Sequence, residues 1–255
     1  MSLLVVHEIE RAFYGLRALR GVTFSVRAGA ITGLIGPNGA GKTTLFNVVS
    51  GMLRADGGRV TFDGKDVTNL PPHALTRAGL VRSFQIARGF PRLTVLENLM
   101  LYAQDNPGET LAGALAGGAR VHAAEARIRE EALRVAERLR LDHVKDNLAS
   151  DLSGGQKKLL EIGRVMMARP RLILLDEPAA GVNPTLTKAI AGHIRDLAAE
   201  GMTVLIIEHD MELVRDLCNP VVVMAEGRTL VEGTFAEVVA DTRVQEAYLG
   251  RNAWH

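Results

Sequence analysis

The stretch Ile31-Thr-Gly-Leu-Ile-Gly36-Pro-Asn-Gly-Ala-Gly41-Lys42-Thr43-Thr44 decides the fold of this chain. It begins with mostly β-branched and aliphatic residues, which predict a buried strand. It ends in a glycine-rich segment, and Leu45-Phe-Asn-Val-Val49 then opens a helix. A strand, a glycine-rich turn and a helix in this order aim successive backbone N–H groups and a positive helix N-terminus at one point, where phosphate binds.

The glycine-rich segment has the spacing Gly36-x4-Gly41-Lys42-Thr43, which matches the nucleotide phosphate loop in full. We expect the lysine to reach the terminal phosphates and the Thr43 hydroxyl to coordinate Mg²⁺. The alternative is a strand-to-helix turn without a ligand, which the strand and helix on either side of the motif disfavour. The whole loop is predicted to bind the nucleotide: Gly36, Pro37, Asn38, Gly39, Ala40, Gly41, Lys42, Thr43 and Thr44.

A second strand ends in two carboxylates, in Leu172-Ile-Leu-Leu-Asp176-Glu177. The carboxyl edge of an open α/β sheet is where ligands bind. We expect Asp176 to hold Mg²⁺ through its water shell and Glu177 to act as the general base toward an attacking water. Acidic residues after a strand also serve as helix caps, so this signal depends on the phosphate loop for its strength.

The pentapeptide Leu152-Ser153-Gly154-Gly155-Gln156 has two compatible interpretations. Ser153 and Gln156 have the spacing of a capping box, which would open a helix over Lys157 to Met167. A capped helix N-terminus with two glycines is also an anion site.

Composition and charge limit the function classes. Apolar residues make up 47% of the 255 positions and charged residues 23%, which excludes a disordered chain. The formal net charge of +1 provides no basic field for nucleic acid, so no nucleic-acid partner is expected. The single Cys218 excludes a disulfide framework and a cysteine-only zinc site. We expect no spanning helix and no cleavable leader, and hence a cytoplasmic protein.

Two kinds of pattern divide the chain. Continuous apolar runs at Leu172–Leu175 and Val204–Ile207 are typical of parallel strands buried on both faces. Apolar residues at spacings of three and four from Val121 to Leu139 predict a long helix with one apolar stripe. We predict one domain over residues 1–250, with an α/β core over about 1–86 and 169–232, an inserted helical lobe over about 87–168 and a helical tail over about 233–255.

The order of these motifs resembles that of ATP-binding cassette (ABC) ATPases: a phosphate loop, Gln85, Leu-Ser-Gly-Gly-Gln, Leu-Ile-Leu-Leu-Asp-Glu-Pro and His209. The resemblance covers nearly the whole chain, from about Leu3 to Gly250. It implies an α/β fold: a P-loop NTPase (RecA-like) core with an N-terminal antiparallel β subdomain and an inserted α-helical lobe. It also implies ATP and Mg²⁺.

The resemblance assigns roles to single residues. Gln85 would touch Mg²⁺ and the attacking water, and His209 would contact the γ-phosphate, so both join Glu177 as catalytic candidates. A lone histidine after a strand is more often structural, but its place directly after a buried strand favours function. In this family the signature pentapeptide of one protomer closes over the γ-phosphate held by another, which assigns a role in trans to Ser153, Gly154, Gly155 and Gln156.

The family stacks an aromatic side chain on adenine just before the second strand. Phe13-Tyr14-Gly15 offers two candidates; the register favours Phe13, Tyr14 is the alternative, and a core aromatic is the competing structural interpretation.

Flanking residues resemble one subfamily, the ATPase subunits of bacterial branched-chain amino acid importers (LivG type). They include Ser83-Phe-Gln85, Leu93-Thr-Val-Leu-Glu-Asn-Leu99, Ile207-Glu-His-Asp-Met211 and Ala247-Tyr-Leu-Gly250. Asn183 stands where many members have Asp, and it keeps hydrogen-bonding capacity. ATPases for urea, amides, aromatic acids or lipopolysaccharide export are the alternatives, together with a soluble non-transport ABC ATPase.

The subfamily implies a transport complex. It would contain two membrane permease subunits, a homodimer or a heterodimer with a second ABC ATPase, and indirectly a periplasmic substrate-binding protein. The chain would lie on the inner face of the cell membrane. Arg88, Phe90 and Arg92 are the candidate permease contacts, with a solvated loop as the alternative.

Overall fold

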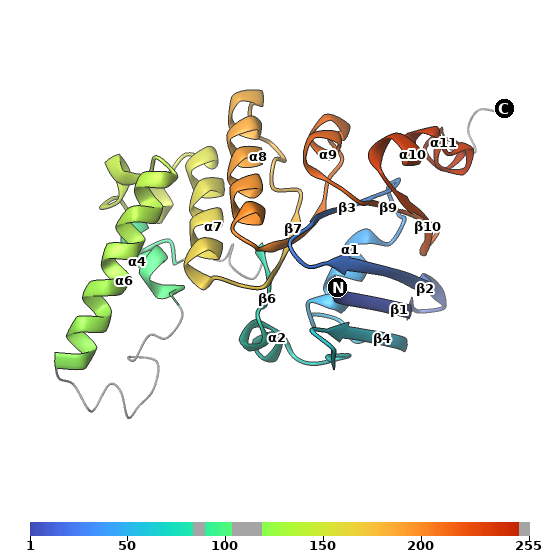
Figure 1. Cartoon of the computed structure of the whole chain (residues 1–255), viewed down its shortest axis with the longest axis horizontal. Helices are drawn as coiled ribbons and strands as arrows, with labels where there is room; N and C mark the ends of the chain where they lie inside the picture. Colours follow the sequence, from blue (N-terminus) through green and yellow to red (C-terminus); the bar gives the residue numbers. More distant parts are fainter. Residues whose placement is uncertain (84–89, 104–118, 250–255) are drawn as a thin grey trace. The chain divides into compact units, whose positions relative to one another are not determined.

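A computed structural model describes residues 1–83, 90–103 and 119–249 (Figure 1). The chain divides into two compact units, Met1–Arg82 with Arg171–His255, and Ser83–Pro170.

The first unit contains an antiparallel sheet of four strands in the order β2-β1-β4-β5. Its strands are β1 (Ser2–Phe13), β2 (Leu16–Arg27), β4 (Gly57–Phe62) and β5 (Lys65–Asp66). β1 and β2 are long because their pairing continues through several register shifts to the hairpin at Phe13 and Leu16.

A second sheet of six strands has the order β10-β9-β3-β8-β7-β6. Its parallel strands are β3 (Ile31–Ile35), β6 (Leu80–Arg82), β7 (Leu172–Asp176), β8 (Thr203–Ile207) and β9 (Val221–Ala225), and β10 (Arg228–Gly233) is antiparallel to β9. The strands β3, β7 and β8 are buried along almost their whole length, as their continuous apolar runs predict. Their carboxyl ends meet at one edge of the sheet.

Helices complete this unit: α1 (Lys42–Val49), α2 (Pro72–Ala78), α8 (Pro184–Ala199), α9 (Met211–Leu217), α10 (Phe235–Ala240) and α11 (Thr242–Leu249). Leu45, Phe46 and Val49 of α1 belong to one apolar core with residues of both sheets. The helix after the glycine-rich turn is therefore fixed in the middle of the unit, and its N-terminus lies at the ligand edge of the parallel sheet.

The second unit is helical. It contains α4 (Val95–Leu101), α6 (Ala119–Arg138) and α7 (Gly154–Ala168), with short 3₁₀ turns at Asp142–Val144 and Ala149–Asp151. The predicted apolar stripe is buried at Ile128, Ala132 and Val135 of α6 and at Leu139 directly after the helix. Across the described part of both units, no helix combines the length and the hydropathy that crossing a bilayer requires.

Candidate functional site

The glycine-rich turn leaves β3 at a position where side chains do not fit. Gly36 has φ +148°, and a Cβ there would overlap the carbonyl oxygen of Met224 in β9. Gly41 has φ +98°, and a Cβ would come 2.7 Å from the carbonyl oxygen of Ala18. Among the described residues, no side chain caps α1 at Gly41, so the N–H groups of its first turn remain for a ligand.

Lys42 lies inside the loop that it serves. Its Nζ donates hydrogen bonds to the carbonyl oxygens of Gly36 (2.6 Å) and Pro37 (3.0 Å). Burial lowers the pKa of the ammonium, and the carboxylates of Glu177 and Asp176 oppose this shift. A cation held in this way, beside free N–H groups, suits the terminal phosphates of a nucleotide.

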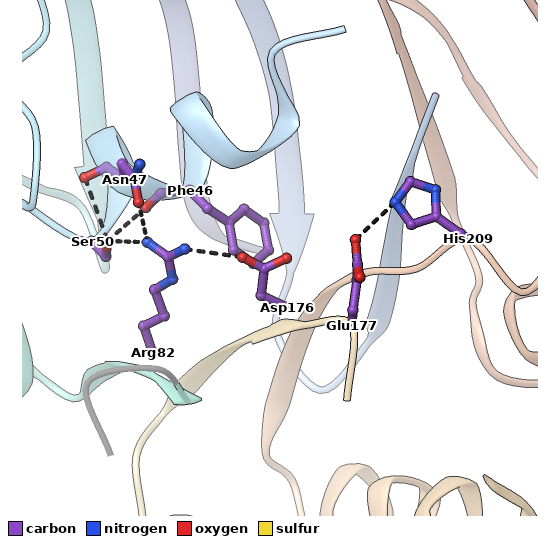
Figure 2. A network of polar contacts seen from close by, with 7 residues as sticks. All are labelled: Phe46, Asn47, Ser50, Arg82, Asp176, Glu177 and His209. Atoms are coloured by element: carbon purple, nitrogen blue, oxygen red, sulfur yellow. Dashed lines mark hydrogen bonds and ion pairs between the residues drawn. The ribbon is translucent and has the colours of Figure 1, made fainter. Parts of the chain in front are cut away.

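Glu177 and His209 meet at the ends of two neighbouring strands. Glu177 follows β7 with φ +48°, in the left-handed region, and its N–H donates to the carbonyl oxygen of Ile207 at 2.9 Å. Its Oε1 lies 2.8 Å from Nε2 of His209 (Figure 2). A backbone held in a sparsely populated region at a ligand edge is typical of functional positions.

The helix-cap interpretation of the Asp176–Glu177 pair is wrong. The next helix, α8, begins at Pro184, and its N-cap is Asn183, whose Oδ1 accepts the N–H of Leu186 at 2.9 Å. The hydrogen-bonding capacity kept by Asn183 is therefore used inside the chain. The two carboxylates remain for the ligand edge.

Two buried charged residues at this edge were not predicted from the sequence. Arg82 ends β6, and its guanidinium contacts Asp176 (Figure 2). Glu208 accepts the N–H of Ala179 after β7 and that of His209, both at 3.2 Å, so it ties these two loops together. Burial raises the pKa of the Glu208 carboxyl. The sequence feature that could have identified both residues is a charged side chain directly at the end of an apolar strand.

A pocket of about 670 Å³ is lined by most of the predicted phosphate-loop residues and by Glu177 and His209, whereas Gly36, Pro37 and Asp176 do not line it. Its volume is that of a typical small-molecule site. It is lined by Asn38 to Thr44, Glu177, His209, Leu16 to Ala18, Arg20, Glu226 and Gly227.

Neither adenine candidate lines this pocket. Tyr14 is fully exposed at the tip of the β1–β2 hairpin, and Arg11 lies over the ring of Phe13 at 4.8 Å from its centroid. Leu16, the cross-strand partner of Phe13, does line it. The choice between the two aromatics stays a prediction.

The signature pentapeptide opens α7 in the second unit. The Ser153 hydroxyl accepts the N–H of Gln156 (3.3 Å), and Oε1 of Gln156 accepts the N–H of Ser153 (2.9 Å), which confirms the capping box. The helix begins at Gly154, earlier than the expected Lys157. A Cβ on Gly154 would meet nothing within 4 Å, so packing within the chain does not require this glycine. Gln85 lies outside the described residues, and its predicted role stays a prediction.

The donor atoms at the strand edge suit Mg²⁺. A threonine hydroxyl at the start of α1 and a carboxylate at the end of β7 are hard oxygen donors, which Mg²⁺ prefers together with substrate phosphates. Over the described ranges, no cluster of three or more His, Cys, Asp or Glu forms a metal cage of its own. Thr43 and Asp176 would hold Mg²⁺ here, and the chemistry supplied by the ion would be neutralisation of phosphate charge.

Comparison with known proteins gives the family. The ABC transporter family matches residues 19–180. The chain belongs to this family. It is therefore the ATP-binding and ATP-hydrolysing subunit of a transporter, and ABC ATPases of this kind work with membrane permease components. The family "Branched-chain amino acid ATP-binding cassette transporter" additionally matches residues 228–253.

Individual relatives align over almost their full length. A probable branched-chain amino acid transport ATP-binding protein LivG from Archaeoglobus fulgidus is 44% identical, with 98% of this chain and 96% of the relative covered. The lipopolysaccharide export ATP-binding protein LptB from Haemophilus influenzae is 36% identical, with 98% of each chain covered. The crystal structure of a nucleotide-free ATP-binding cassette from an ABC transporter superposes with a TM-score of 0.83 at 41% identity, covering 98% of this chain and 100% of the other. The predicted fold class is confirmed.

Proposed function

We propose that this ABC ATPase binds Mg²⁺·ATP in the pocket at the carboxyl edge of β3 and β7, and that its hydrolysis energises import of branched-chain amino acids. The observation that supports the site is the convergence of Lys42, Glu177 and His209 on one pocket. The cargo is supported by the family match over residues 228–253 and by the LivG relative.

In the proposed reaction, the phosphate loop holds ATP and a water attacks the γ-phosphorus. The bond from that phosphorus to the β–γ bridging oxygen breaks, and ADP leaves with the electron pair. Glu177 accepts the proton of the water as general base. His209 would orient this carboxylate and contact the γ-phosphate, and the 2.8 Å distance between its Nε2 and Oε1 of Glu177 supports the first of these roles.

A head-to-tail dimer would complete each site. Ser153 to Gln156 of one protomer would cover the γ-phosphate bound by the other, with the exposed N-terminus of α7 as the anion site. Hydrolysis would then remove the contact that holds the protomers together. A permease coupled to this opening would alternate its access between the two sides of the membrane.

The permease contact is proposed at residues 88–92. Phe90 is about half exposed although it is a large aromatic residue. Arg92 is exposed beside it, which gives a cationic and aromatic surface of the kind enriched in interfaces. Arg88, the third predicted contact, lies outside the described residues.

Affinity capture from mildly solubilised native membranes tests the proposal. We expect two polytopic permease subunits to be recovered with the chain, with or without a second ABC ATPase. The complex should then be reconstituted with its periplasmic binding protein, and leucine should stimulate ATP hydrolysis where urea does not. Recovery of the lipopolysaccharide export permease would favour the LptB-like alternative instead. Recovery of only non-membrane proteins, with ATPase activity intact, would reject the transport proposal.

A further inference from the structure

Arg82 is a buried charge at the edge of the nucleotide pocket's own sheet. It is the last residue of β6, and only 6% of its side chain is exposed. A buried guanidinium is stable only when charged and polar partners surround it. The identity of these partners therefore tells what the residue holds in place.

The partners of Arg82 come from two elements of the site (Figure 2). On one side, Nη2 lies 3.0 Å from Oδ2 of Asp176, whose side chain is 9% exposed. On the other side, Nη1 donates to Oδ1 of Asn47 at 2.5 Å and to the Ser50 hydroxyl at 3.3 Å. The Phe46 ring packs against the guanidinium, 5.7 Å from Cζ to the ring centroid.

These contacts connect the two residues predicted to hold Mg²⁺. Asp176 is bonded directly, at the end of β7. Thr43 lies on α1 four residues before Asn47, so the two share one helix face, one turn apart. A rigid, planar guanidinium fixed at both ends thus sets the position of the Asp176 carboxylate relative to the N-terminus of α1.

We propose that Arg82 is a positioning residue for Mg²⁺·ATP. Through Asp176 Oδ2 and Asn47, it holds the carboxylate and the Thr43 end of α1 in the arrangement that receives the metal. The proposal rests on the proposed function, because it takes Asp176 and Thr43 as the residues toward Mg²⁺. It predicts that Arg82 affects the metal dependence of nucleotide binding more than binding of the nucleotide itself.

The test compares Arg82→Met, Arg82→Lys and Arg164→Met in the full chain. Arg164 is the matched control, because it is buried to 4% exposure, donates to Asn98 Oδ1 at 2.6 Å and packs on the Tyr102 ring, all within the helical unit. ATP affinity is measured by equilibrium binding in EDTA and over a series of free Mg²⁺ concentrations, at protein dilutions that keep the chain monomeric. Thermal unfolding without ligand reports the general loss of stability.

We expect Arg82→Met to raise the half-maximal Mg²⁺ concentration about tenfold or more, the scale of a lost charge-assisted hydrogen bond, while affinity in EDTA changes less than about twofold. The half-maximal Mg²⁺ concentration of Arg82→Lys should lie between those of the wild type and Arg82→Met, because lysine keeps the charge but lacks the planar guanidinium that binds two partners at once. Arg164→Met should lower the unfolding temperature and leave the Mg²⁺ dependence unchanged. An unchanged or lower half-maximal Mg²⁺ concentration in folded Arg82→Met would overturn the proposal. A lower value would mean that the arginine competes with the metal for Asp176.

Asp176→Asn separates this proposal from the function on which it rests. Suppose that Mg²⁺ strengthens ATP binding in the wild type and in Arg82→Met but not in Asp176→Asn. In that case only the role of Arg82 is rejected. If neither Mg²⁺ nor Asp176→Asn changes ATP binding, the proposed metal site itself is wrong. Should Arg82→Met fail to fold, Asn47→Ala removes one anchor of the guanidinium and should still raise the Mg²⁺ requirement several-fold; a wild-type response there rejects the proposal.

Discussion

At the residue scale, the left-handed backbone of Glu177 turns its carboxylate toward His209 at the pocket. Glu177→Gln keeps the shape and the hydrogen-bonding capacity of this side chain and removes its basicity. We expect ATP turnover to fall by about 10²- to 10⁴-fold, the usual contribution of a general base, with ATP binding retained and the dimer stabilised. Steady-state ATPase assays and size-exclusion chromatography with ATP check this prediction. Turnover at the wild-type rate would show that another group accepts the proton.

Lys42 provides a second prediction, on pH. Because burial lowers its pKa, the unfolded chain holds this proton to higher pH than the folded chain does. Stability contributed by this group therefore increases as pH rises from the folded pKa toward 10.5, the ordinary value. We expect the free energy of unfolding of the wild type to increase relative to that of Lys42→Met as the pH rises toward 10.5. Denaturant titrations of both proteins measure it, and a difference that is constant with pH contradicts the shift. The variant should also bind ATP more weakly.

The residues that the sequence predicted at the site share one property: their motifs combine a local conformation with a chemical group. The phosphate loop, the Asp176–Glu177 pair and His209 all follow apolar strands, so periodicity placed them at one sheet edge. Arg82 and Glu208 also stand at the ends of apolar strands, but their partners are distant in the sequence. Asp176 lies 94 positions from Arg82, and Ala179 lies 29 positions from Glu208. Which residues become partners depends on the order of the strands in the sheet, and a single sequence does not reveal that order.

At the scale of elements, two helix glycines allow a matched comparison. Gly192 lies inside α8, and a Cβ there would meet nothing within 4 Å. Gly192→Ala should raise the free energy of unfolding by about 0.5–1 kcal/mol, because alanine loses less backbone entropy in a helix. Gly163 lies inside α7, where a Cβ would come 2.7 Å from Leu99 and 2.9 Å from Leu139.

Gly163→Val therefore forces side-chain atoms into the contact of α7 with α4 and α6. We expect it to lower the free energy of unfolding by about 1–3 kcal/mol, the scale of an overpacked core. Urea titrations monitored by circular dichroism compare both variants with the wild type. A Gly163→Val variant as stable as the wild type would mean that this close packing of α7 is absent in solution.

Periodicity located the helices and the buried strands but not all of their ends. β1 continues through the polar residues Glu8, Glu10 and Arg11 because it pairs with β2 on one side and β4 on the other, and register shifts accommodate Glu8 at φ +48°. In α7, the capping box starts the helix at Gly154 although glycine disfavours helix interiors. Pairing and capping outweigh local propensity at these ends.

At the scale of the whole molecule, the phosphate loop and the signature pentapeptide belong to different units, and the proposed head-to-tail dimer would assign them to different ATP molecules. Lys42→Ala and Gly154→Asp would then disable different halves of each site. Gly154 tolerates a side chain, and an aspartate suits the first turn of α7, so this variant should fold while its charge repels the γ-phosphate. Each variant alone should be inactive. Mixed in equal amounts, the two form heterodimers with one intact site, and ATPase activity should return.

The control for this mixture is Lys42→Ala with Glu177→Gln, since both changes affect the site that the same chain's phosphate loop forms. Every heterodimer of that pair contains one defect per site and should stay inactive, although its protomers associate as readily. Activity in the first mixture alone therefore requires that one protomer lends its signature pentapeptide to the ATP of the other. If both mixtures remain inactive while size-exclusion chromatography detects heterodimers, there are two explanations. Either hydrolysis requires both sites of the dimer to be intact, or the pentapeptide does not act in trans. Isothermal titration separates these outcomes, because only an intact composite site binds one ATP per heterodimer more tightly than either homodimer does.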